Sequence, residues 1–306
     1  MLPLPLLRWE APHQLVDLVR LAAEPGARLI AGGTDLVPSM KHRIFRPALL
    51  VSTRRVAELR AVAVAADGAC SLGAALTLQE VAAHPHVRTA FPALAAACRT
   101  VATPTIQHMG TLGGNLMLDT RCMYYNQPAG WRSALGGCLK CEGTLCHVAP
   151  RGTGCYAAHS ADTVPVLMLL GATARFVTVA GETCVPVAEL YTDDGRDGPK
   201  LPTGAVLVAV ELPPPSRPVV YRKLRQRGAI DYALLLTAVA PAPEGWEAVI
   251  SAVGPRPVLV SAATRPALID AVYQAVQPLP THQQSSTWRK RMLRVEVGRA
   301  LAALPD

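Results

Sequence analysis

The spacing of apolar and polar residues divides the first half of the chain into short elements with helix and strand periods. The pattern predicts a helix at residues 12–23, strands at 27–31 and 49–52, a hairpin at 60–75 turning at Asp67-Gly68, and helices at 77–83 and 90–101. The strand at 27–31 runs directly into Gly32-Gly33. Strand, glycine turn and following helix together have the architecture of an anion site.

The second half continues the same alternation up to a proline-rich break. We expect a helix at 161–170, a hairpin at 175–187 turning at Gly181-Glu182, a strand at 205–212, further strands at 219–224, 232–240 and 246–253, and two final helices. Pro213-Pro214-Pro215-Ser216 is the clearest linker and predicts a domain boundary there. No apolar run approaches the roughly 18 residues that span a bilayer, so we expect no membrane segment.

Composition and charge narrow the function classes. Half of the 306 residues are hydrophobic, and 23 Gly with 27 Pro favour many short elements. The net charge of +8 is compatible with nucleic acid, an acidic partner or a solvated surface. Arg289, Lys290, Arg291, Arg294 and Arg299 are interpreted as the solvated face of an amphipathic helix. Without interleaved aromatics they do not predict nucleic-acid binding.

Five of the eight cysteines lie close together, as Cys122, Cys138, Cys141, Cys146 and Cys155. A segment this short needs a metal, disulfides or a partner to fold. The apolar start of the chain is too short for a signal peptide, which predicts a cytoplasmic protein whose clustered thiols are metal ligands. Four thiolates suit zinc or an iron-sulfur cluster equally. The remaining cysteines, Cys70, Cys98 and Cys184, are expected in the core.

Two glycine stretches, residues 32–35 and 110–115, are candidate phosphate sites. Glycine lets backbone N–H groups approach an anion, and Thr34, Thr111 and Asn115 add side-chain donors. Each stretch alone is more typical of a tight turn than of an anion site. Neither matches the G-x-G-x-x-G fingerprint or a Walker loop, which disfavours a Rossmann domain.

Together, four motifs resemble the flavoproteins of the molybdenum-hydroxylase family. They are IAGGTDLVP at 30–38, IQHMGTLGGNL at 106–116, SADTVP at 160–165 and YRK at 221–223, in the expected order. The resemblance implies an α+β fold: a two-subdomain FAD-binding domain at residues 1–213, with a cysteine-rich insertion at about 119–159, and a smaller C-terminal αβ domain at 217–306. It also implies that FAD lies against Leu29, Ile30, Ala31, Gly32, Gly33, Thr34, Asp35, Leu36, Val101, Ile106, Gly110, Thr111, Gly113, Gly114, Asn115, Asp162 and Lys223.

Specific roles are implied in the same way. Residues 30–36 and 110–115 would wrap the pyrophosphate, Asp162 would bond the adenosine side, and Lys223 would lie near the isoalloxazine. From the residues alone, Asp162 is equally a helix N-cap and Lys223 a surface lysine.

The insertion resembles that of 4-hydroxybenzoyl-CoA reductases, whose beta subunit carries a 4Fe-4S cluster on a C-x15-C-x7-C-x8-C pattern. The resemblance implies Cys122, Cys138, Cys146 and Cys155 as ligands and leaves Cys141 as a spare thiol, although Cys138 and Cys141 form a C-x2-C pair.

The implied function is an electron-transfer subunit without catalytic residues. Electrons would pass from a ferredoxin-like donor through the 4Fe-4S cluster and FAD to a 2Fe-2S subunit and a molybdenum subunit, for reductive dehydroxylation. The alternatives are the flavin subunit of an oxidative molybdenum hydroxylase, and a zinc-stapled binding module of another class.

Overall fold

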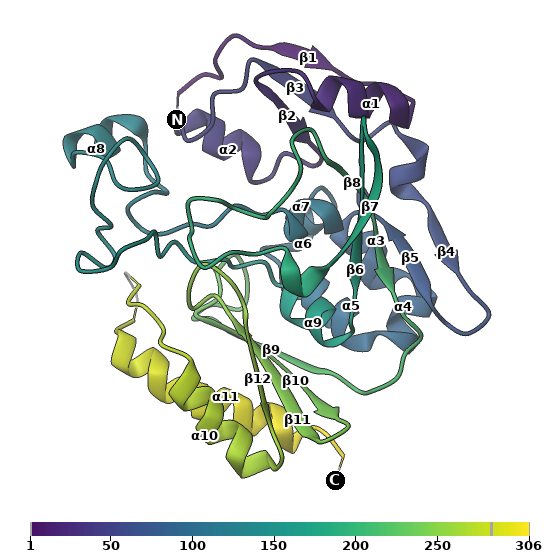
Figure 1. The fold of residues 1–306 in the computed structure, drawn as a ribbon, viewed down its shortest axis with the longest axis vertical. Helices are drawn as coiled ribbons and strands as arrows, with labels where there is room; N and C mark the ends of the chain where they lie inside the picture. The colour runs from purple at the N-terminus through teal and green to yellow at the C-terminus, as the bar shows by residue number, and fades with distance from the viewer. Residues whose placement is uncertain (1, 282–283, 306) are drawn as a thin grey trace.

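A computed structural model describes residues 2–281 and 284–305, which form three β-sheets with helices around them (Figure 1). The first sheet is parallel, in the order β1-β3-β2, with β1 at Arg8–Glu10, β2 at Ala27–Ile30 and β3 at Leu49–Ser52. Helix α1 (Leu15–Ala22) buries Leu18 and Leu21 beside β3. Helix α2 (Leu36–Lys41) begins directly after the glycine turn.

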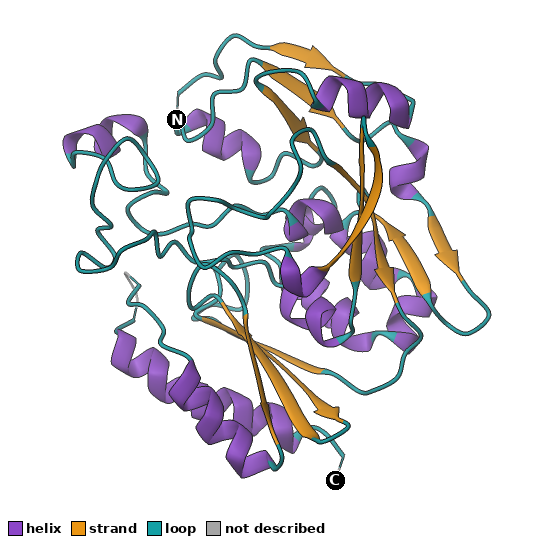
Figure 2. Ribbon diagram, viewed as in Figure 1, coloured by secondary structure: helices purple, strands orange, loops and turns teal. Residues whose placement is uncertain are grey.

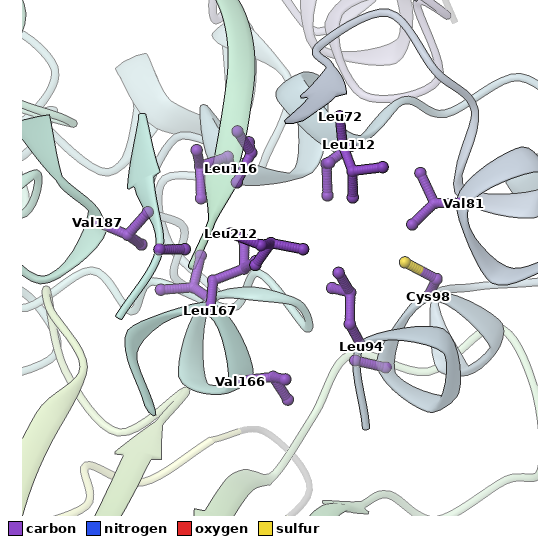
Figure 3. Packing of buried hydrophobic residues seen from close by; sticks show 14 of the residues in the cluster. Leu72, Val81, Leu94, Cys98, Leu112, Leu116, Val166, Leu167, Val187 and Leu212 are labelled. Carbon is purple, nitrogen blue, oxygen red and sulfur yellow. The ribbon is translucent and has the colours of Figure 1, made fainter. Parts of the chain in front are cut away.

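The second sheet is antiparallel and supports most of the helices. Its order is β4 (Val62–Val64), β5 (Cys70–Gly73), β8 (Val206–Leu212), β6 (Thr173–Thr178) and β7 (Gly181–Pro186). The helices of this part are α3 (Leu78–Ala83), α4 (Pro85–Ala90), α5 (Pro92–Thr100), α6 (Pro104–Gln107), α7 (Leu112–Leu116) and α9 (Val164–Leu169), with 3-10 turns at Ala57–Arg60 and Val187–Glu189. Figure 3 shows part of their shared core, including Leu72 from β5, Leu112 from α7 and Leu212 from β8.

The third sheet is a four-stranded antiparallel meander covered by two long helices (Figure 2). It consists of β9 (Val220–Leu224), β10 (Leu235–Ala242), β11 (Gly245–Ser251) and β12 (Val258–Ala262), followed by α10 (Arg265–Ala275) and α11 (Ser286–Ala302). One face buries its own apolar cluster against α10 and α11. The other face contributes Ala238, Ala240 and Val249 to the core that contains α9.

The cysteine-rich segment lies apart from the three sheets, at the left of Figure 1. It is loop except for α8 (Ala129–Ala134) and a few isolated bridges. At its base, Arg121 and Ala158 exchange both backbone hydrogen bonds, at 3.0 and 2.8 Å. The segment is therefore closed at the neck. Among the described residues, no helix is both long and apolar enough to cross a membrane.

Most predicted elements are confirmed with shifted ends, and several features differ. The β6–β7 hairpin turns at Val179-Ala180, not at Gly181-Glu182, since Thr178 pairs with Gly181. The unpredicted elements are strands β1 and β12 and helices α4, α6, α7 and α8. Cys184 is exposed on the outer strand β7, so its core assignment is wrong.

Arg289 is not on a solvated face, because only 2% of it is exposed. Its guanidinium donates to the backbone carbonyls of Leu234, just before β10, and Ala252, just after β11. Burial lowers the pKa of Arg289 to about 10. The helical charge pattern could not distinguish a solvated arginine from one that binds buried carbonyls.

Candidate functional site

The two glycine stretches, far apart in the sequence, are in direct contact. A β-carbon on Gly32 would lie 1.8 Å from the carbonyl oxygen of Met109, and one on Gly110 would lie 3.5 Å from Oγ1 of Thr34. Only glycine permits the first of these approaches. The contact places Thr34 next to the second loop, which also contains Thr111.

The first glycine loop has open backbone donors. Within the described residues, the N–H groups of Gly32, Gly33, Thr34 and Asp35 have no hydrogen-bond acceptor. Gly33 has φ of +71°, a conformation that glycine adopts without strain. Successive free N–H groups in such a turn form a concave site for an anion.

The second glycine loop has fewer open backbone donors than the sequence suggested, because most of its N–H groups are bonded within the protein. The N–H groups of Leu112 and Gly113 donate to the carbonyls of Leu76 and Ala74, at 2.9 and 2.8 Å. The N–H of Gly114 is capped by Oγ1 of Thr111 at 3.0 Å. This loop therefore acts chiefly as a rigid wall against which the first loop is held.

The side-chain oxygen of Asn115 is bonded within the protein and is not open to a ligand. Its side-chain oxygen accepts from the backbone N and from Oγ1 of Thr163, at 3.2 and 2.7 Å. These bonds fix the residue next to Asp162 relative to α7. The predicted donor role of Asn115 would rest on its amide nitrogen alone.

Asp162 and Lys223 form a buried ion pair, with 2.7 Å between Oδ1 and Nζ and side-chain exposures of 7% and 3%. The two interpretations made from these residues alone, a helix cap and a surface lysine, are therefore wrong. Asp162 is not a helix cap, since α9 has Thr163 as N-cap and no side-chain cap bond, and Lys223 is not on the surface.

Two further residues complete this pair and were missed from the sequence. The Tyr221 hydroxyl donates to Asp162 at 3.0 Å, and Thr100 bonds both Asp162, through Oγ1, and Lys223, through its carbonyl. Burial raises the pKa of the Tyr221 hydroxyl well above its usual value. Tyr221 stands in the YRK motif, which was the available signal.

Residues 99–107 connect the ion pair to the glycine loops. Val101 follows Thr100, and its carbonyl accepts from Nε2 of Gln107 at 2.7 Å. Ile106 lies one residue earlier than Gln107, and its carbonyl accepts from the N–H of Gly110 at 2.7 Å. Leu29, Ile30, Ala31 and Leu36 flank the first loop at the end of β2 and the start of α2.

Four of the five clustered cysteines line one small cavity: Cys122, Cys138, Cys146 and Cys155, together with Tyr124, Tyr125, Leu139, Lys140, His147, Val148 and Ala157. Cys141 is not among them; its sulfur accepts from Nε of Arg132 at 3.3 Å. The cavity has a volume of about 10 Å³ for the centre of a water molecule, which is room for one water. The cysteine loops would have to move apart to admit a larger group.

The environment of these thiols is apolar. Burial raises the pKa of Cys122, and raises that of Cys155 to about 11. The backbone N–H of Tyr125 donates to the sulfur of Cys122 at 3.3 Å. Within the described residues, no three His, Cys, Asp or Glu side chains stand as a group that could hold a metal ion.

Charged side chains link the cysteine cavity to the first glycine loop. Lys140 on the cavity wall pairs with Asp119 at 2.6 Å, Asp119 with Arg121 at 3.1 Å, and Arg121 with Asp35 at 2.8 Å. Lys140 and Arg121 are 6% and 7% exposed. The sequence contained no local signal for this chain of charges, because its members are dispersed.

Open backbone donors of this kind bind the phosphates of nucleotide cofactors in other proteins. The family profile described as "FAD binding domain in molybdopterin dehydrogenase" matches residues 5–215. The chain belongs to this family of FAD-binding subunits of molybdenum hydroxylases, which confirms the resemblance at the level of the family.

Named relatives are subunits of such enzymes. The chain is 34% identical to the aldehyde oxidoreductase FAD-binding subunit PaoB of Escherichia coli K12 over 232 residues, 72% of each chain. It is 27% identical to the putative xanthine dehydrogenase FAD-binding subunit XdhB of the same strain, over 65% of this chain and 55% of that protein.

Solved structures confirm the α+β fold. Quinoline 2-oxidoreductase from Pseudomonas putida 86 superposes with a TM-score of 0.76 at 22% identity, covering 98% of this chain and 97% of that chain. Reconstituted CO dehydrogenase from Oligotropha carboxidovorans gives 0.77 at 20% identity, covering 98% of both.

Proposed function

We propose that this FAD-binding subunit also holds a 4Fe-4S cluster and passes electrons between partner subunits. The observation that supports the proposal most directly is the single cavity lined by Cys122, Cys138, Cys146 and Cys155, from which Cys141 is absent. These four are the ligands implied by the cysteine spacing. FAD supplies one- or two-electron exchange and the cluster one-electron exchange.

The presence of a flavin site on the same chain favours a cluster over zinc. Four thiolates suit either group. A one-electron centre on an FAD-binding chain has a use in electron transfer, which a structural zinc ion does not. A cluster would require the cysteine loops to move apart, since the cavity has room for one water.

On this proposal, the chain's own residues hold FAD in two places. The free N–H groups of Gly32 to Asp35 and the Thr34 hydroxyl would bind the pyrophosphate. The Asp162–Lys223 pair, braced by Tyr221 and Thr100, would hold the cofactor on the side of β9. Both stand on rigid elements, which keeps the cofactor's orientation fixed.

The proposed partners are a molybdenum subunit and a 2Fe-2S subunit in a hetero-oligomer. The relatives carry names such as FAD-binding subunit and medium chain, which supports a division of labour among chains. Substrate would then bind on another chain, and the domains here, about 1–213 with the insertion and 217–306, serve electron transfer.

For the reaction itself, oxidation of an aldehyde-type substrate is the first candidate, because the similarity to PaoB extends over 232 residues. Electrons would then leave molybdenum through this chain. Reduction of 4-hydroxybenzoyl-CoA, fed by a ferredoxin-like donor, is the second candidate, and the cysteine spacing favours it. The assembled complex distinguishes them: dye reduction with aldehydes supports the first, and benzoyl-CoA formation with a low-potential donor supports the second.

Cofactor analysis of the purified chain tests the cluster. We expect about four irons per chain and one FAD, with broad absorption near about 400 nm. Cys146→Ser should lose the iron, whereas the matched Cys141→Ser should retain it, because only Cys146 lines the cavity. Stoichiometric zinc, or iron lost from Cys141→Ser and kept in Cys146→Ser, would contradict the proposal.

A further inference from the structure

Asp35 is the last of the four residues whose backbone N–H groups are open. It ends the first glycine loop and is the N-cap of α2, a position from which an aspartate usually accepts from nearby backbone N–H groups. Here its side chain makes no such bond. Instead Oδ2 of Asp35 accepts from Nη2 of Arg121 at 2.8 Å. The carboxylate is held away from the open donors of its own loop.

Arg121 is fixed from several sides, so it can hold that carboxylate in place. The same Nη2 donates to Oγ of Ser39 on α2 at 3.0 Å, and Nη1 donates to Asp119 at 3.1 Å. Its guanidinium carbon lies 5.3 and 5.7 Å from the ring centres of Phe45 and Tyr125. An arginine 7% exposed and held on both edges loses little freedom on forming the ion pair.

The charge matters as much as the geometry. An unpaired carboxylate beside Gly32 to Thr34 would compete for their N–H groups and would repel the two negative charges of a pyrophosphate. Paired with Arg121, Asp35 does neither. We propose that Arg121, which immediately precedes the first cysteine of the insertion, is a positioning residue for FAD, and that it acts by keeping Asp35 out of the pyrophosphate site.

This inference rests on the proposed FAD site, and it ties the insertion to that site. Arg121 lies at the neck of the cysteine-rich segment, and Asp119 connects it to Lys140 on the wall of the cysteine cavity. FAD binding should therefore respond to changes in the neck, although no residue of the neck need touch the cofactor.

A double-mutant cycle tests the inference by FAD affinity, a readout that needs no turnover. The full-length chain is depleted of FAD, and rebinding is followed by quenching of flavin fluorescence. We expect Arg121→Gln to weaken FAD binding about tenfold when Asp35 is present, and less than about threefold in an Asp35→Asn background. Loss of the carboxylate should thus remove most of the need for the arginine.

The control is Arg175→Gln, which breaks an ion pair between β6 and Glu211 on β8, has no contact with Arg121 or Asp35, and should leave FAD affinity unchanged. If Arg121→Gln does not fold, as judged by circular dichroism, Arg121→Met, which also removes the charge and keeps a long side chain, gives the same comparison in both backgrounds. Equal losses with and without the Asp35→Asn substitution, or no loss in either background, would overturn the inference. A wild-type chain that cannot rebind FAD would instead overturn the proposed function.

Discussion

Gly32 has no room for any side chain, because a β-carbon would lie 1.8 Å from the Met109 carbonyl oxygen. Gly32→Ala must therefore force the two glycine loops apart. We expect the variant to lose FAD binding by at least about tenfold while the sheets stay folded, measured by flavin content and by FAD titration.

Gly130→Ala is the matched control. Gly130 lies in α8, a β-carbon added there would meet no heavy atom within 4 Å, and its φ is not positive. Alanine there should leave flavin content unchanged. Equal flavin in the two variants would show that contact between the loops is not needed for binding.

At the scale of residues, the sequence predicted a site best where the residue type has few possible roles. The glycine loops and the four cysteines that line one cavity are examples, because both stand out in the sequence by residue type and spacing. Arg121 and Asp35 were not paired in advance, since 86 residues separate them and each is an ordinary charge locally. The burial of Lys223 was missed for the same reason: it depends on Asp162 in another element.

His159 follows the neck of the insertion and contacts the loop after β11 of the C-terminal sheet. Its N–H donates to Gly254 at 2.9 Å, its carbonyl accepts from Ala252 at 3.0 Å, and its ring lies 4.2 Å from that of Tyr191. Both ring nitrogens are buried without a partner among the described residues, and burial lowers the pKa of His159 to about 3.

This burial predicts a specific pH dependence of stability. Between its unfolded pKa of about 6.5 and about 3, His159 binds a proton only in the unfolded chain, so its burial costs stability as pH falls below about 6.5. His159→Phe keeps the ring contact and removes the titration. By urea unfolding, the variant should lose about 2 kcal/mol less than wild type between pH 7 and pH 4.5. Parallel pH curves would contradict the assignment.

At the scale of elements, short periodic segments were predictable and their ends were not. The pattern of β6 and β7 gave the hairpin, but glycine at 181 suggested a turn that the strand pairing places at 179–180. Cys184 belongs to an apolar strand pattern, yet β7 is the outermost strand and leaves it exposed. Whether such a strand residue is buried depends on the order of strands in the sheet, which cannot be deduced from the sequence of one strand.

For the whole molecule, the Asp162–Lys223 pair joins β9 of the C-terminal sheet to the segment before α9. Lys223→Met would leave a buried carboxylate with only hydroxyl partners. We expect a loss of about 3 kcal/mol in the free energy of unfolding by urea, partly restored by adding Asp162→Asn.

The exposed pair of Arg294 and Asp270, with exposures of 51% and 69%, provides the control. Arg294→Met should change stability by less than about 1 kcal/mol. A similarly small effect of Lys223→Met would mean that the buried pair does not hold the two parts together.

The proline-rich linker at 213–216 was predictable from composition, and so was the change of element pattern beyond it. The core that the C-terminal sheet shares with α9 was not predictable. Ala238, Ala240 and Val249 are small apolar residues of an ordinary strand pattern, and nothing local indicates that they pack with α9 instead of α10 and α11.

The closed neck formed by Arg121 and Ala158 has an evolutionary consequence. Because the two backbones already pair there, the chain enters and leaves the cysteine-rich segment at adjacent points. A short turn could therefore join Arg121 to Ala158 in place of residues 122–157, since inserted segments with neighbouring ends are tolerated by a folded domain. Such a deletion would also remove the hydrogen bonds that Arg132 and Lys140 donate to the carbonyls of His42 and Gly195. A flavoprotein that lost the segment in one genetic event would then have to satisfy those carbonyls in another way.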